Sequence, residues 1–120
     1  MTSDIKKKLK QMIAASGAMK AEKVFLFRTG DEVPMPFVVL TDFRAEFGRT
    51  KDGVLPPDVT FVALCVAATS KEACDISNAI AEALDGVAVA DYDEVRLLSI
   101  AEAFDFEQGA FVNTMEFLIN

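Results

Sequence analysis

The chain has 120 residues, a hydrophobic share of 52% and a mean hydropathy of +0.27, values that suit a single domain spanning residues 1–120. It contains no histidine, which excludes catalysis by a Ser–His–Asp or Cys–His arrangement and removes the commonest metal ligand. The net charge is −7, but residues 1–28 hold seven Lys or Arg against two Asp or Glu, whereas residues 29–120 hold five against seventeen. This acidic body disfavours tight binding of nucleic acid, because affinity for phosphate depends on Lys and Arg.

The first predicted element is an amphipathic helix over residues 4–16. Its apolar residues recur at helical spacing at Ile5, Leu9, Met12 and Ile13. Gly17 suits the C-terminal stop of this helix. The basic segment loosely resembles a signal peptide, but its apolar part is short, and the longest apolar run of the chain, Phe61–Ala68, cannot span a bilayer. We therefore expect an intracellular protein that does not enter a membrane.

Three strands are predicted next. Residues 23–27 are rich in strand-forming side chains, and residues 37–43 form a second such run that can extend to Phe47. The polar residues 48–57, which include Gly and Pro, predict an irregular connection. Residues 59–67 are apolar with little alternation, which indicates a central strand that is covered on both faces.

The clearest local signal predicts a helix over residues 70–85. Thr69 and Glu72 form a capping box, in which the Thr69 side chain accepts from the amide of Glu72 and the Glu72 side chain reaches back to the amide of Thr69. Gly86 suits the left-handed position that follows a helix. One apolar stripe runs along the helix through Ala73, Ile76, Ile80, Ala83 and Leu84.

The C-terminal part is predicted to form a hairpin. Residues 87–93 are predicted to form an irregular or short extended link, residues 94–104 a strand, residues 105–109 a loop and residues 111–119 the last strand. The last strand turns one set of side chains to the same face: Phe111, Met115, Phe117 and Ile119. The whole order predicts an α+β fold, a mainly antiparallel five-stranded sheet with two helices packed on one face and residues 59–67 in its centre. The opposite face is then partly bare, which is a reason to expect protein partners.

The two cysteines are not expected to pair. Cys65 lies within an apolar run and is predicted to be a buried small hydrophobe, while Cys74 falls in the second helix. Neither has the spacing of a metal or redox motif, so the sequence favours a reducing compartment and predicts no disulfide.

No catalytic, cofactor or metal site is predicted. The acidic cluster at residues 91–94 lacks the glycine and the spacing of a calcium loop, and Asp105 with Glu107 flank a turn. Solvated turns are the favoured interpretation of both, and an enzyme that uses carboxylates alone stays open as an alternative. Arg44, Arg49 and Lys51 lie in or beside the longest connection, where a solvated loop is the favoured interpretation and contact with phosphate or an acidic neighbour is the alternative. The candidate interface consists of Arg44, Glu46, Phe47, Arg49 and Lys51.

Several segments, in their order and spacing, resemble the phage tail-terminator family, the tail-completion or minor tail proteins of the lambdoid type. The resemblance covers nearly the whole chain. It rests on the N-terminal helix, on Pro36-Phe37-Val38-Val39, on the apolar strand that leads through Val66 and Thr69 to Glu72-Ala73, on Ala83-Leu84-Asp85-Gly86, and on Asp105, Gly109, Phe111, Met115, Phe117 and Ile119.

The resemblance implies a structural role without catalytic residues or cofactors. Such proteins form rings, commonly hexamers, that sit on the last ring of the tail tube, stop its polymerisation and present a surface to the head-side connector. The expected partners are other copies of the chain, the tail tube protein and the connector or stopper protein, with DNA only in transit. The expected location is the tail or neck of the virion, after synthesis in the host cytoplasm.

In such a ring, acidic residues are expected to line the channel and repel passing DNA. The candidates are Asp91, Asp93, Glu94 and Glu107. Lys6, Lys7, Lys8 and Lys10 are then expected to face away from the axis. Two alternatives remain open: a head-side stopper or connector ring protein, and a small regulatory α+β domain that binds a ligand.

Overall fold

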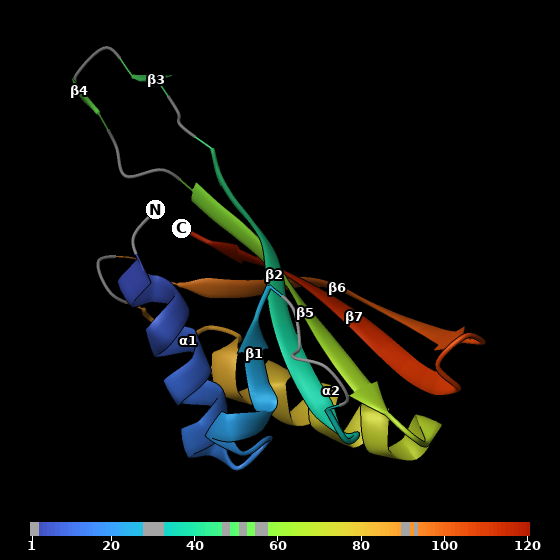
Figure 1. Ribbon diagram of the computed structural model, residues 1–120. Coiled ribbons are helices and arrows are strands. Elements are labelled where there is room, and N and C mark those ends of the chain that lie inside the picture. Colours follow the sequence, from blue (N-terminus) through green and yellow to red (C-terminus); the bar gives the residue numbers. More distant parts are fainter. Residues whose placement is uncertain are drawn as a thin grey trace.

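The computed structural model describes residues 3–27, 33–46, 49–50, 53–54, 58–89, 92 and 94–120. In chain order the elements are α1 (Ser3–Ser16), the 3-10 helix η1 (Ala21–Lys23), β1 (Val24–Leu26), β2 (Phe37–Glu46), β3 (Arg49–Thr50), β4 (Gly53–Val54), β5 (Asp58–Ala67), α2 (Ser70–Leu84), β6 (Val95–Asp105) and β7 (Ala110–Ile119). Figure 1 shows two helices against a twisted sheet, with β3 and β4 apart from the body. Neither helix is long and apolar enough to cross a membrane within these described ranges.

The main sheet has five strands in the order β1-β2-β5-β7-β6. Only β1 and β2 run parallel, and the other three neighbouring pairs are antiparallel. The predicted α+β class is therefore confirmed, and so is the central position of residues 59–67, which lie within β5. This strand is central because its helix-facing side chains are wholly buried, while Leu64 and Val66 on its other face are also largely covered.

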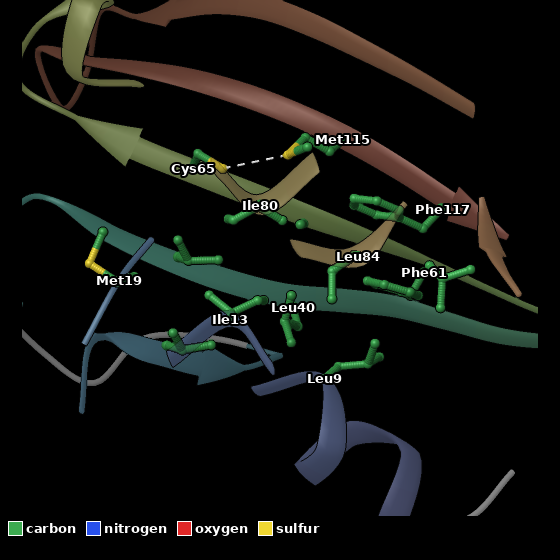
Figure 2. Close-up of a cluster of buried hydrophobic side chains, with 14 of the residues drawn as sticks. Leu9, Ile13, Met19, Leu40, Phe61, Cys65, Ile80, Leu84, Met115 and Phe117 are labelled. Carbon is green, nitrogen blue, oxygen red and sulfur yellow. Dashed lines mark hydrogen bonds between the residues drawn. The ribbon is translucent and has the colours of Figure 1, made fainter. Parts of the chain in front are cut away.

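Both helices pack on the same face of the sheet. The core cluster joins Leu9 and Ile13 of α1 to Ile80 and Leu84 of α2, and both pairs meet the side chains of one sheet face (Figure 2). From the sheet the cluster takes Val24, Val38, Leu40, Val59, Phe61, Ala63, Cys65, Ala67, Val95, Met115, Phe117 and Ile119. A row of aromatic rings crosses this core, with Phe61 stacked on Phe117 at 5.0 Å between ring centroids.

The ends of α2 follow the predicted chemistry. Thr69 is the N-cap, and its Oγ1 accepts a hydrogen bond from the Glu72 amide at 3.1 Å, which is the first of the two bonds of the predicted capping box. After the helix, Gly86 adopts a φ of +79°, a left-handed conformation that a side chain would oppose.

The connection between β2 and β5 differs from the prediction. It contains a short antiparallel ladder in which Arg49 pairs with Val54 and Thr50 with Gly53, so the expectation of a wholly irregular segment is wrong at these residues. Gly53, which pairs with Thr50, is the sequence signal for a turn here, because Gly is favoured at the fourth position of a β-turn.

Candidate assembly surfaces

The open face of the sheet, on the side away from both helices, is apolar at one end. Phe37 and Val39 of β2, Leu64 and Val66 of β5 and Val112 of β7 line a cavity of about 350 Å³ there. Phe27, Asp105 and Gln108 complete its lining. The arrangement follows from strand alternation, since residues of even number on β5 and β7 point away from the helices. It offers a concave apolar surface with few polar groups.

The other end of the open face is polar. A register shift between Thr41 and Arg44 marks a bulge in β2, where Asp42 has a φ of +53°. Next to it lies a cavity of about 460 Å³, lined by Asp42, Phe43, Arg44, Thr60, Phe61, Val62 and Glu116. Farther along, Glu46 is paired in register with Asp58, and both are exposed. Directly opposed carboxylates repel, so a cation from a partner would stabilise this end.

The structure separates the predicted interface residues. Arg44 and Glu46 lie two residues apart at the end of β2 and share the open face. The backbone of Arg49 belongs to β3, while Phe47 and Lys51 lie outside the described residues.

Of the four predicted channel-lining residues, the two that the structure describes, Glu94 and Glu107, lie far apart. Asp91 and Asp93 are outside the described residues. Glu94 precedes β6 and Glu107 follows it, so the strand Val95–Asp105 separates them by roughly 33 Å at the rise of an extended strand. If β6 runs along a channel, Glu94 and Glu107 lie at two different positions along the channel axis.

A set of exposed apolar side chains was not anticipated from the sequence. Leu98, Ile100 and Phe104 of β6 and Phe106 of the following turn are large and exposed. Their strand was correctly predicted, but its place at the outer edge of the sheet depends on long-range pairing that local periodicity does not reveal. The signal that was available is the run from Leu97 to Phe104, which carries little polar alternation for a strand.

The two thiols are not activated for chemistry. Burial raises the pKa of Cys65 to about 12, and its Sγ lies 3.8 Å from the Sδ of Met115. The pKa of Cys74 is also raised, first because its thiol donates a hydrogen bond to the Glu102 carboxylate at 2.9 Å. Both thiols therefore stay protonated at neutral pH, and neither is a nucleophile of the thiolate type.

A small buried polar network fixes α2 to β7. Asn113 is buried on the helix-facing side of β7, and its Nδ2 donates to the Oγ of Ser77 at 3.2 Å. Ser77 is also buried, and its Oγ donates to the carbonyl of Cys74 at 3.1 Å. Among the described residues no buried side-chain nitrogen or oxygen lacks a hydrogen-bond partner, which fits a structural role for this network.

Metal-ligating side chains do not converge in the part of the chain that the structure describes. Within it, no group of three or more His, Cys, Asp or Glu is close enough to hold an ion.

Comparison with known proteins gives a likeness in fold. The structure is similar to a chain of a solved structure described as the virion of a native gene transfer agent particle, with a TM-score of 0.72 and 15% sequence identity. The match covers 92% of this chain and 89% of that chain, so it includes nearly the whole domain of both. No family model matches the sequence, and no curated protein matches it. At this identity the likeness establishes a shared fold.

Proposed function

We propose that the chain is a ring subunit of a phage or phage-like tail, which caps the tail tube, ends its polymerisation and joins the tube to the head-side connector. One observation carries the proposal: the whole-length likeness in fold to a chain of a gene transfer agent virion. The resemblance of the sequence to tail terminators supports the finer assignment to the end of the tube. The proposed role is structural, without catalysis, cofactor or metal.

The surfaces of the domain suit such a role. A ring subunit needs contacts with two neighbours and with the structures above and below it. The chain offers two outer strands, β1 and β6, and an open sheet face with an apolar and a polar end. Both helices pack on the remaining face, so the open face and the outer strands are the surfaces of the sheet at which we expect partners to bind.

The charge distribution suits a channel through which DNA passes. The body beyond residue 28 is strongly acidic, so it repels phosphate instead of holding it. We expect the purified chain to give no shift of duplex DNA in a gel at moderate salt. Tight binding of DNA by the isolated protein would contradict this part of the proposal.

The proposal is tested by deleting the gene for this chain and imaging the resulting particles by negative-stain electron microscopy. A terminator leaves tubes of abnormal and variable length when it is removed, because nothing stops the addition of tube subunits. Expression of the wild-type chain from a plasmid should restore a uniform length. Tubes of normal, uniform length that fail to join heads would instead support the alternative of a head-side stopper. Particles of normal length, joined normally to heads, would contradict both roles.

The apolar cavity on the open face supports a second candidate function, the binding of a small ligand. Its volume of about 350 Å³ falls within the range of small-molecule sites, and Asp105 and Gln108 add polar groups to an apolar wall. A thermal-shift screen of small apolar acids and amines, repeated with Val112→Lys, would detect a ligand that depends on this cavity. No stabilisation by any compound would count against this candidate.

A further inference from the structure

Exposed apolar side chains lie on or next to the two outer strands of the sheet: Phe27 directly follows β1, Met35 precedes β2, and Phe106 follows β6. The β6 edge, as we call it, consists of Leu98, Ile100, Phe104 and Phe106, with exposed fractions of 51%, 41%, 41% and 88%. The β1 edge consists of Phe27 and Met35, with exposed fractions of 53% and 38%, and of the neighbouring Lys6. Because β1 and β6 are the two ends of the strand order, these two strands lie at opposite margins of the sheet. The Phe27 side chain also reaches onto the open face, where it lines the apolar cavity. Figure 1 shows the strands themselves.

The charges of the two edges are complementary. The described segment 94–107 around the β6 edge carries Glu94, Glu102, Asp105 and Glu107 against the single cation Arg96. Around the β1 edge, the flank of α1 with Lys6 and Lys10, together with residues 20–23, carries four lysines against the single anion Glu22. An acidic apolar surface and a basic apolar surface attract each other, and each repels a second copy of itself.

Phe27 is held in an exposed position by its surroundings. Its φ of +71° is strained for an aromatic residue, and the Nζ of Lys6 lies 4.8 Å from its ring centroid. The ring also packs edge-on against Phe43 at 5.7 Å, and Phe43 in turn stacks on the core residue Phe61 at 5.4 Å. A strained backbone and a fixed exposed ring are features typical of a preorganised contact residue.

We propose that the β6 edge of one copy binds the β1 edge of the next copy. This inference rests on the proposed function and names the contact that would join neighbouring subunits. Because the two edges differ, the contact is head-to-tail, and such contacts close into a ring when the rotation between copies permits. A symmetric contact of two β6 edges would bring four carboxylates against four others and leave the β1 edge uncovered.

Two variants that block opposite edges test the contact. Leu98→Lys places a cation on the β6 edge, where the basic edge of the neighbour arrives. Phe27→Glu places an anion on the β1 edge, which is proposed to contact the acidic β6 edge of the neighbouring copy. Sedimentation velocity should show the wild-type chain as an assembly several times 13.0 kDa, whereas each variant alone should lose association by at least roughly tenfold. Ile100→Lys and Met35→Glu repeat the test in case either variant folds poorly, and Asn78→Lys, on the exposed side of α2, is the matched control.

Mixing the two variants separates the possible geometries. Each variant keeps the edge that the other has lost, so an equal mixture should form a dimer that stops at twice the chain mass. If Phe27→Glu alone still dimerises, the β6 edge binds itself and the inference is wrong. A wild-type chain that remains a monomer at millimolar concentration, or two variants that assemble like Asn78→Lys, would also overturn it. Failure of this contact is distinguishable from failure of the proposed function. Variants that still restore a uniform tube length would contradict the contact between edges but support the role as a terminator.

Discussion

The network between Asn113 and Ser77 allows a quantitative test of how α2 is held on the sheet. Asn113→Ala removes the donor that bonds the Ser77 Oγ and leaves space in a side-chain layer that is almost fully buried. The lost hydrogen bond accounts for about 1 kcal/mol of the free energy of unfolding. The smaller side chain costs about 1 kcal/mol more through lost packing, so the expected total is about 2 kcal/mol.

The coupling between the two residues is the informative quantity. Ser77→Ala alone should cost about 1 kcal/mol, and the double variant should cost about 2 kcal/mol, because one hydrogen bond cannot be lost twice. The assay is urea denaturation followed by circular dichroism, with the midpoint compared at constant m-value. Additive losses, with the double variant about 3 kcal/mol less stable, would refute the claim that the two side chains bond each other in the folded protein.

Three further predictions concern single residues. Thr69→Ala should lower the free energy of unfolding by about 1 kcal/mol, because it removes the N-cap acceptor of α2, and an unchanged urea midpoint would show that the helix begins elsewhere. Gly109→Ala should lower the free energy of unfolding by about 1 kcal/mol because Gly109 has a φ of +63°, which a side chain opposes. Steric overlap adds nothing to this loss, since no atom lies within 4 Å of the added Cβ. A variant that is stabilised in thermal melts would contradict this conformation. Between pH 9.0 and about 12 the unfolded thiol of Cys65 loses its proton, while the native thiol, whose pKa burial raises to about 12, keeps it. Stability should therefore fall by about 1.4 kcal/mol per pH unit relative to Cys65→Ala, and parallel pH profiles would show that the thiol is not buried.

Local patterns in the sequence predicted most of the elements, because their signals act over a few residues. The capping residue Thr69 and the helix stops at Gly17 and Gly86 fix both helices within a residue or two of the predicted bounds. The continuous apolarity of residues 59–67 was sufficient to place that strand in the centre of the sheet. Cys65 is buried as predicted, for the same reason.

Features that depend on contacts between distant parts of the chain were not predicted from the sequence. Leu98 and Ile100 look like core residues in a strand, but they are exposed, whereas Val95 of the same outer strand is fully buried. How far the core covers β6 depends on the packing of distant elements, which local periodicity does not reveal. The inter-element bond of Asn113 to Ser77 joins residues 36 positions apart, which no periodicity can detect. The predicted channel residues Glu94 and Glu107 were grouped by charge, whereas an eleven-residue strand lies between them.

The central claim is that this chain forms the ring that ends the tail tube. Its most direct test is a cryo-electron microscopy reconstruction of the neck of particles that contain the wild-type chain. The account predicts one ring of identical copies, expected to be six, between the last tube ring and the head-side connector. In this ring the β6 edge of each copy contacts the β1 edge of the next. The side chains of Lys6, Lys7, Lys8 and Lys10 face away from the axis. Density for the chain elsewhere in the particle, or a channel lined by those lysines, would contradict it.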